Sequence, residues 1–310
     1  MPNNLVPRYT TIAVFIAILA VSTASLFIKF AQREAPSLAI AAVRLIISSL
    51  FLLPIAISRY KYEIFSIKRK DLFLASISGI FLAFHFATWI ASLEYTSVAS
   101  SVVLVSTGPI WVALFSFICM KESISRSLVL GMLIALAGGF LIAMSEACKW
   151  QGVIVCPSSS TFFQTKSVFG DILAFLGAVM VSGYLLIGRQ LRTRIPLIPY
   201  IFIVYCIAAV VLIILMLSAG QSPFGYSFET YIWLILLALI PQIIGHSTYN
   251  WSLRFLPAST VAVATLGEPI GATILAYFLL NETPSGIKIA GAIIILAGIY
   301  ITISKQRNIN

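Results

Sequence analysis

Nearly the whole chain divides into apolar runs of the length that crosses a lipid bilayer. Of its 310 residues, 60% are hydrophobic and only 10% are charged, whereas soluble domains carry about 25% charged residues. A membrane-spanning helix needs about 20 consecutive apolar residues, because the bilayer core is about 30 Å thick. Helices are favoured because lipid offers backbone groups no outside partner. The sequence therefore predicts an all-α integral membrane protein with no soluble domain between the runs.

Ten runs are expected, and most of the connections between them are short. They cover approximately residues 11–30, 37–57, 72–93, 97–119, 127–145, 170–189, 196–218, 230–252, 258–280 and 286–303. The first run follows a basic flank, as a signal peptide does, but it is longer than the apolar region of such a peptide. We therefore expect it to be the first of ten transmembrane helices.

The basic residues are distributed unevenly between the two sides of this arrangement. Of the 20 Lys and Arg residues, fourteen fall in the termini and in the loops after the second, fourth, sixth and eighth runs, and five fall on the opposite side. Cytoplasmic loops are enriched in Lys and Arg. We therefore expect both termini in the cytoplasm and the protein in a bacterial-type inner membrane. The formal charge of +10 is then an orientation signal, so no nucleic-acid partner is expected.

The chain contains an internal repeat. A shift of 160 positions, without a gap, superposes proline, glutamate and glycine residues that shared apolar composition does not explain. The aligned pairs include Ser92-Leu93 with Ser252-Leu253, Pro109-Ile110 with Pro269-Ile270, Glu122 with Glu282, Gly131 with Gly291, and Gly138 with Gly298. This indicates two repeats, residues 1–145 and 170–310, joined by an extracytoplasmic loop at residues 146–169.

Each repeat holds five expected helices, so the second repeat enters the membrane from the side opposite to the first. Inverted repeats of this kind build many secondary transporters, in which the substrate site lies near the membrane midplane between the halves. The repeat therefore favours a transporter.

Two helix breaks occupy equivalent places in the ninth and fourth runs. They are formed by Gly267 with Pro269, and by Gly108 with Pro109. Proline removes a backbone hydrogen bond, and glycine permits close helix approach. We interpret them as gates or cavity walls; a packing kink is the alternative.

Glu268 stands in an apolar run, where the first repeat has Gly108. An ionisable residue at membrane depth is a functional-site hypothesis by default. The carboxyl group is a candidate for reversible proton binding or for pairing with a cationic substrate. Alternatively, it is the structural partner of Arg44, which lies inside the second run.

Both histidines of the chain lie in apolar runs, one in each repeat and one position apart in the repeat register. They are either buried core residues or part of a cavity lined with aromatic side chains, which suits an amphipathic or cationic substrate. The candidate substrate-binding residues are His85, Trp89, Tyr184, His246, Tyr249, Asn250, Trp251 and Glu268.

Glu122 and Glu282 close the fourth and ninth runs in matched contexts, where a structural charge role is favoured. Cys148 and Cys156 share the long loop. A disulfide between them is open, because extracytoplasmic loops permit one.

The chain resembles the EamA-like branch of the drug/metabolite transporter superfamily. The resemblance rests on AAVRLIISSLFLLP in the second run, on the paired segments SLEYTSVASSVVLVSTGPIW and SLRFLPASTVAVATLGEPIG, and on GMLIALAGGFLIAMS with GAIIILAGIYITIS. It implies a ten-helix carrier with cytoplasmic termini, a central cavity lined by helices 1–4 and 6–9, and peripheral fifth and tenth helices. The long loop departs from the family pattern.

We therefore expect a secondary-active transporter of small polar or amphipathic metabolites such as amino acids or amines, working by alternating access as an exporter or exchanger, with protons as candidate coupling ions. A channel or a non-transporting membrane sensor is the alternative. A membrane enzyme is disfavoured, because the chain has neither clustered aspartates nor a zinc, nucleophile-elbow or P-loop motif. No catalytic residue, metal or cofactor is expected.

Overall fold

The computed structural model describes residues 9–96, 101, 104–121, 125–147, 149–150, 154–155, 165–271, 275 and 286–306. Its helices are α1 (Thr10–Ser22), α2 (Ala24–Ala31), α3 (Ser37–Arg59), α4 (Lys61–Phe65), α5 (Arg69–Tyr95), α7 (Gly108–Met120), α8 (Arg126–Ala147), α10 (Thr165–Arg192), α11 (Leu197–Ser218), α12 (Phe228–Leu237), the π-helix η1 (Ala238–His246), α13 (Ser247–Ser252), α14 (Ala258–Thr265) and α16 (Gly286–Gln306). Two short strands, β1 (Lys149–Trp150) and β2 (Ile154–Val155), pair antiparallel between α8 and α10.

Six helical stretches of the described residues are long and apolar enough to cross a membrane. They are Thr10–Ala31, Ser37–Arg59, Arg69–Tyr95, Val168–Arg192, Leu197–Ser218 and Phe228–Ser252. They coincide with the first three runs and with the sixth to eighth runs of the sequence. Shorter apolar helices cover Gly108–Ile118, Arg126–Gly138 and Ile289–Ile301. The all-α, multi-pass membrane fold is confirmed.

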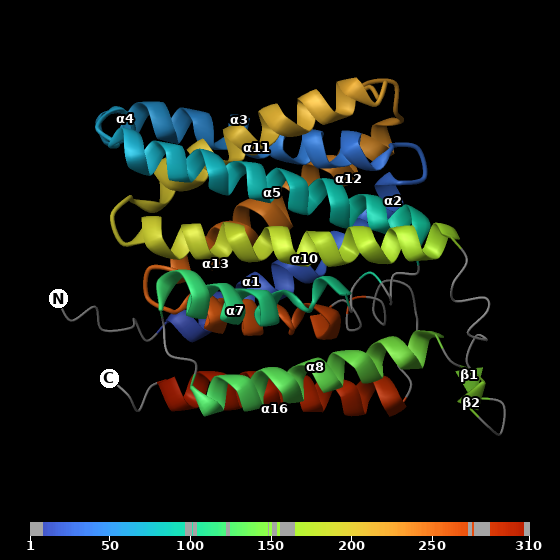
Figure 1. The fold of residues 1–310 in the computed structure, drawn as a ribbon. Helices are drawn as coiled ribbons and strands as arrows, with labels where there is room; N and C mark the ends of the chain where they lie inside the picture. Colours follow the sequence, from blue (N-terminus) through green and yellow to red (C-terminus); the bar gives the residue numbers. More distant parts are fainter. Residues whose placement is uncertain are drawn as a thin grey trace.

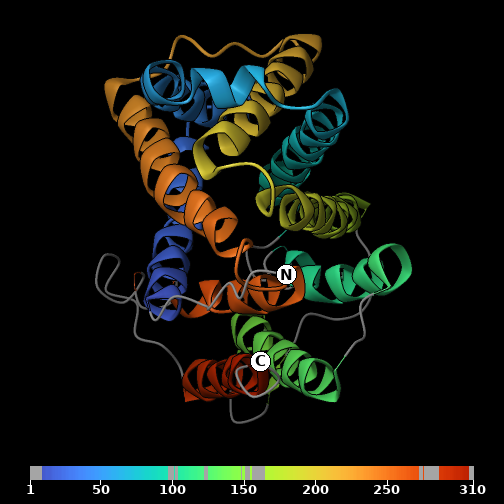
Figure 2. The same cartoon turned by 90° about the vertical axis from the view of Figure 1, so that its left-hand side faces the viewer.

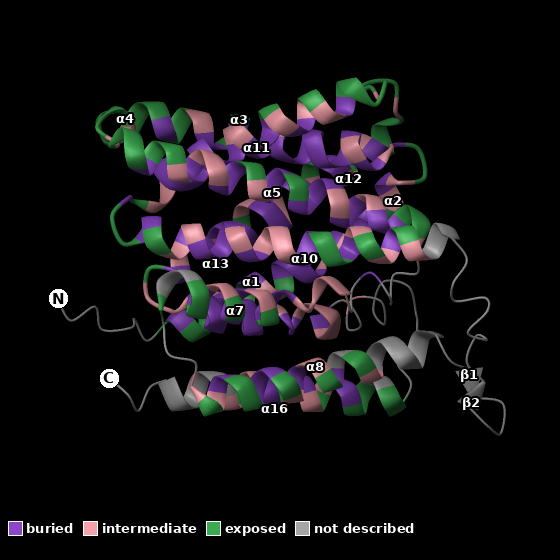
Figure 3. Cartoon of the chain, viewed as in Figure 1, coloured by how far each residue is buried: buried purple, intermediate pink, exposed green. Residues whose placement is uncertain are grey.

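Exposed residues recur along the helices (Figure 3), and many of them are large and apolar. Phe51 on α3, Ile214 on α11 and Tyr300 on α16 are 51%, 60% and 72% exposed. Soluble monomers rarely expose extended apolar patches, whereas lipid tails solvate them without cost. The exposed surface therefore suits a hydrocarbon environment.

The main helix pairs join one repeat to the other (Figures 1 and 2). α5 packs along α10, α3 along α11, and α1 against η1. α8 and α16 form a separate pair at the edge of the bundle, and α7 and α14 lie between that pair and the rest (Figure 1). A two-repeat architecture fits this arrangement, because the core lies where the halves meet.

Hydrogen bonds inside each half reproduce the 160-residue offset. Lys29 Nζ donates to the carbonyl of Leu93 at 3.2 Å, and Arg189 Nη1 donates to the carbonyl of Leu253 at 2.7 Å. The next turn repeats this relationship: Gln32 Nε2 donates to the Ile90 carbonyl, at 3.1 Å. Its equivalent, Arg192 Nε, donates to the Asn250 carbonyl at 3.0 Å. The sequence register is therefore also a structural register.

Glycines set the spacing between α8 and α16. A Cβ atom on Gly138 would lie 2.6 Å from the Gly291 carbonyl oxygen, and one on Gly298 would lie 2.5 Å from that of Gly131. Both contacts are with backbone, which has little freedom to move. Small residues of this kind allow membrane helices to approach closely.

The third helix of each repeat departs from this symmetry. α5 is a continuous α-helix, whereas its equivalent passes through the π-helical turns of η1, which contain Pro241. Proline cannot donate to the helix ladder. π-helical turns occur frequently at functional sites. The break was not expected from the sequence; it ends at His246, and Asn250 follows one turn later on α13.

Candidate functional site

Arg44 lies at the centre of the bundle with no exposed surface. Its Nε donates to Oε1 of Gln242 on η1 at 2.9 Å, and its Cζ lies 4.0 Å from the centre of the Phe86 ring. Within the part of the chain that the structure describes, Nη1 and Nη2 of Arg44 are buried without a hydrogen-bond partner. The guanidinium is thus held along one edge and over one face, while its terminal amino groups are unused.

A line of aromatic contacts connects Arg44 to Glu268. The ring of Phe86 meets that of His246 edge-on at 5.3 Å, and His246 meets Tyr249 at 6.3 Å. The Tyr249 hydroxyl donates to Oε1 of Glu268 at 3.4 Å. Tyr249 and His246 are buried, and Glu268 is half-buried. An arginine and a glutamate therefore lie in one aromatic environment contributed by both repeats.

His85 and Trp89 extend this environment along α5. Their rings stack at 5.9 Å, and Nδ1 of His85 donates to the Gly177 carbonyl of α10 at 2.9 Å. Gly177 brings α10 close to α5, since a Cβ there would lie 3.3 Å from that of Trp89. The indole Nε1 of Trp89 is buried and has no hydrogen-bond partner among the described residues.

Asn250 joins Tyr184 to the same region. Its Nδ2 donates to the Tyr184 hydroxyl and, at 2.7 Å, to the carbonyl of His246. Its Oδ1 is buried and unpartnered within the described ranges. Seven of the eight candidate substrate-binding residues thus lie together with Arg44. We call the following set the central polar cluster: Arg44, His85, Trp89, Tyr184, Gln242, His246, Tyr249, Asn250 and Glu268.

Trp251 lies apart from the central polar cluster. It is half-buried and stacks on Tyr9 with ring centres 5.6 Å apart. It lines a hollow of about 420 Å³ between α1, α3, α11 and α13 whose wall is mostly apolar. The hollow reaches Ser247, whose Oγ lies 3.2 Å from the Tyr205 hydroxyl. Trp251 therefore lines this apolar hollow and does not contact the central polar cluster through its ring.

Three of the four predicted helix-break residues are buried: Gly108, Pro109 and Gly267. Gly108 and Pro109 begin α7 and are buried, and Gly267 precedes Glu268 directly after α14. A Cβ on Gly267 would lie 2.9 Å from the side chain of Ile18 on α1. Their role as gates remains a prediction, as does that of Pro269. Four further residues of the sequence analysis lie outside the described residues: Glu122, Glu282, Cys148 and Cys156.

Gln242 was missed by the sequence reasoning. It is fully buried and is the direct hydrogen-bond partner of Arg44. The sequence analysis had named Glu268 as the candidate for that structural role. The available signal was an amide in the apolar segment LLALIPQIIGH, since a polar side chain at membrane depth needs a partner.

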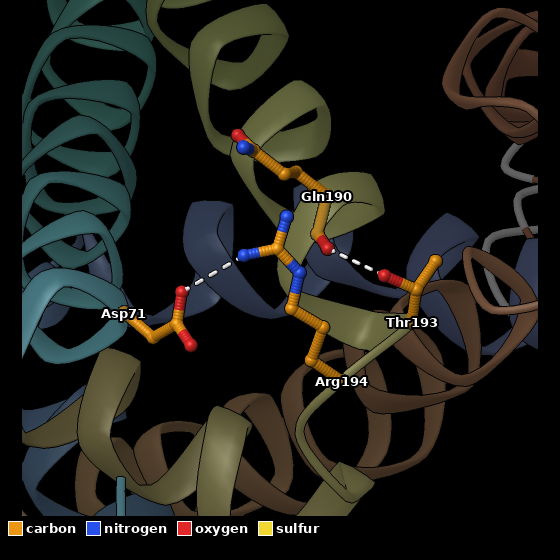
Figure 4. Close-up of polar contacts among 4 residues, drawn as sticks. All are labelled: Asp71, Gln190, Thr193 and Arg194. Atoms are coloured by element: carbon orange, nitrogen blue, oxygen red, sulfur yellow. Dashed lines mark hydrogen bonds and ion pairs between the residues drawn. The ribbon is translucent and has the colours of Figure 1, made fainter. Parts of the chain in front are cut away.

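Contacts between the repeats also occur at the two ends of the bundle. At one end, Glu34 Oε2 accepts from the Ser227 amide and the Thr230 hydroxyl, each at 2.8 Å, at the start of α12. At the other end, Arg194 Nη1 pairs with Asp71 at 3.2 Å at the start of α5 (Figures 1 and 4). The amide of Ser227 is the main reason that the pKa of Glu34 is lowered, followed by the Thr230 hydroxyl.

No group of three His, Cys, Asp or Glu residues able to hold a metal ion occurs within the described ranges. The central polar cluster instead combines hydrogen-bonding, charged and aromatic groups. That combination can bind a small polar molecule inside an apolar protein.

Comparisons with known proteins give the family. The model of the EamA-like transporter family matches the chain twice, over residues 8–144 and 168–304. An uncharacterised transporter of Archaeoglobus fulgidus is 26% identical over 234 residues, covering 74% of this chain and 75% of the relative. Another from Clostridium kluyveri is 23% identical over 270 residues, covering 86% and 83%.

A solved crystal structure shares the fold with a TM-score of 0.77 and 19% identity, covering 97% of this chain and 98% of the other. The two family matches together account for most of the chain. This protein therefore belongs to the EamA-like transporter family and is a multi-pass membrane transporter of small molecules.

Proposed function

We propose that the protein is a secondary-active carrier of small polar or amphipathic metabolites, such as amino acids or amines, and that it acts as an exporter or exchanger. The observation that carries the proposal is the central polar cluster. It is buried among membrane-spanning helices and receives Arg44 and Trp89 from the first repeat and Gln242 and Glu268 from the second. Polar groups are costly at that depth unless they have partners or a function.

In this proposal ten transmembrane helices form two inverted repeats, residues 1–145 and 170–310, with residues 146–169 outside and both termini in the cytoplasm of a cell with an inner membrane. Family membership and the repeated hydrogen bonds support the duplication. The start of α1 and the end of α16 lie at the same end of the bundle (Figure 1), which agrees with this topology.

Alternating access is supported by the contacts at the two ends of the bundle. The Glu34 contact and the Arg194–Asp71 pair each join the first repeat to the second. Rocking of one repeat against the other requires one of these contacts to open while the other remains closed. The helix breaks at Gly108-Pro109 and Gly267-Glu268-Pro269 are the proposed gates.

Proton coupling is assigned to Glu268. Its carboxyl group lies in the cluster and accepts a hydrogen bond from Tyr249. A carboxyl group at membrane depth can exchange a proton for a cationic substrate group, because carrying both leaves an excess positive charge that the apolar surroundings disfavour.

The test is counterflow in proteoliposomes. A ligand-stabilisation screen first selects a candidate compound. Uptake of its labelled form is then measured with and without unlabelled compound inside the vesicles, at pH values from about 5.5 to about 8.5. We expect saturable uptake that internal substrate accelerates, and we expect Glu268→Gln to abolish its pH dependence. Glu63→Gln, on the exposed helix α4, is the control.

Two outcomes would contradict parts of the proposal. Non-saturating conductance in planar bilayers, without exchange, would identify a channel. Unchanged flux and pH dependence in Glu268→Gln would remove the proton role but leave the carrier.

A further inference from the structure

We propose that the Arg44 guanidinium is the subsite that binds the carboxylate group of the transported metabolite. This inference rests on the proposed carrier function and deepens it, because it assigns one half of the substrate's chemistry to one side chain. It is derived from the unused donors of the central polar cluster.

The first observation is the unsatisfied state of Arg44. The side chain is fully buried, yet Nη1 and Nη2 lack hydrogen-bond partners in the described part of the chain. More than about 90% of buried polar groups in proteins have a partner. Leaving a buried charged donor unpaired is strongly unfavourable. The two amino groups are therefore positioned for a partner that is not a protein side chain of this cluster.

Arg192 shows how this chain satisfies a structural arginine. It is also buried, at 2% exposure, but its Nε donates to the Asn250 carbonyl and its Nη1 to that of Ile195. Arg44 differs because only its Nε is engaged, by Gln242. A purely structural role leaves this difference unexplained.

No carboxylate in the described part of the chain forms an ion pair with Arg44. Among the described residues the one ion pair within 4.0 Å is that of Arg194 with Asp71, at the edge of the bundle. Glu268 shares the cluster and interacts with the charge of Arg44, but it is hydrogen-bonded to Tyr249. An anionic group beside Arg44 would balance its charge in surroundings of low polarity.

The geometry specifies a planar oxyanion. Phe86 covers one face of the guanidinium at 4.0 Å, and Gln242 holds the Nε edge. The remaining edge carries both Nη atoms, whose paired N–H groups match the two oxygens of a carboxylate. Fixing the guanidinium before binding also lowers the entropy lost on binding.

The neighbouring unused groups are also mainly donors. Nε2 of Gln242 and Nε1 of Trp89 are hydrogen-bond donors that are buried without partners within the described ranges. Asn250 Oδ1 is a hydrogen-bond acceptor of the cluster in the same state. An excess of donors favours a ligand group that only accepts hydrogen bonds. A carboxylate does so, and an amine does not.

The test compares matched ligands on the full-length protein in detergent. The panel contains apolar amino acids such as leucine and, for each, its carboxamide, its decarboxylated amine and its deaminated acid. Affinity is measured by thermal stabilisation and by competition in proteoliposome exchange. The wild-type protein should bind carboxylate-bearing compounds about 10- to 100-fold more tightly than the carboxamides, the value of one or two charge-assisted hydrogen bonds.

Variants then assign this preference to Arg44. Arg44→Gln should remove the preference for carboxylates, and Arg44→Lys should retain part of it, because it keeps the charge but not the paired N–H groups. Arg59→Gln is the control on the same helix, since Arg59 is exposed. The wild-type comparison of acid with carboxamide needs no variant, so the lack of a preference overturns the inference even where Arg44→Gln does not fold, and Arg44→Lys then tests the assignment to Arg44.

The outcomes separate this inference from the proposed function. Saturable exchange with no preference for carboxylates, or a preference that survives in Arg44→Gln, would overturn the Arg44 subsite and leave the carrier intact. Binding confined to the amines would also overturn it. Absence of saturable exchange for every compound found in the stabilisation screen would overturn the carrier itself.

Discussion

Ser22 and Ser182 form the same hydrogen bonds from opposite repeats. Ser22 Oγ lies 2.6 Å from the Ile18 carbonyl oxygen and 3.0 Å from that of Glu268. Ser182 Oγ lies 2.7 Å from the Ala178 carbonyl oxygen and 3.0 Å from that of Gly108. The serine and its two carbonyl partners are each related by the 160-residue offset. The second partner differs in chemistry, because it is Glu268 in one repeat and Gly108 in the other. Ser22 therefore holds the backbone of the helix break that carries the Glu268 carboxyl group, whereas Ser182 holds the equivalent break, which has no ionisable side chain.

The two serines provide a matched pair of variants. Ser22→Ala and Ser182→Ala should each lower stability by about 1 kcal/mol, the net value of a hydrogen bond. Ser22→Ala should also alter the pH dependence of exchange, because it releases the backbone that positions Glu268. Thermal unfolding and exchange at several pH values measure both effects. Equal pH profiles for the two variants would contradict the link to Glu268.

Glu34 predicts a pH effect on stability. The Ser227 amide and the Thr230 hydroxyl lower its pKa below the ordinary 4.5. A carboxylate with a lowered folded-state pKa adds stability that is complete above the unfolded value and is lost as pH falls through the folded one. Wild-type protein should therefore lose more stability below about pH 4.5 than Glu34→Gln does. Unfolding temperatures across the acidic range measure this difference.

The same comparison contains its own control. Glu34→Gln and the wild type should differ most above the carboxyl range and converge at the lowest pH, where both side chains are uncharged. A constant difference at every pH would show that the charge of Glu34 is not responsible.

Asp71→Asn should loosen the opposite end of the bundle. The Arg194 side chain is 53% exposed and that of Asp71 is 11% exposed, and exposed ion pairs contribute at most about 1 kcal/mol. Global stability should thus change little, while opening at this end becomes up to about 5-fold more frequent. Alkylation of Ala75→Cys, a buried position one turn further along α5, reports this opening by mass spectrometry. Glu63→Gln should leave the labelling rate unchanged, and an unchanged rate in Asp71→Asn would argue against this role.

Gly298→Ala should separate α8 from α16. Its new Cβ would lie 2.5 Å from the Gly131 carbonyl oxygen, and relief of such crowding costs about 1 to 3 kcal/mol. Gly286→Ala on the same helix meets nothing within 4 Å and should be neutral or slightly stabilising. The melting temperatures of the two variants in detergent test this; similar values would contradict close backbone packing at Gly298.

The sequence alone determined the class and the register, and it singled out most members of the central polar cluster. Apolar runs of spanning length leave no other solution than membrane helices. The unbroken offset of 160 predicted equivalences that reappear as hydrogen bonds, such as those of Lys29 and Arg189. Ionisable and amide groups at membrane depth, including His246, Asn250 and Glu268, were conspicuous because they are unfavourable there.

Only the tertiary structure decided which of these groups meet. The pairing of Arg44 with Gln242 joins residues 198 positions apart, and no local pattern encodes that contact. His246 and Trp251 are both candidates from the sequence, yet His246 packs against Phe86 in the central polar cluster and Trp251 stacks on Tyr9 outside it. The physical reason is that spacing along a helix specifies a face, whereas the packing of two repeats specifies what that face touches.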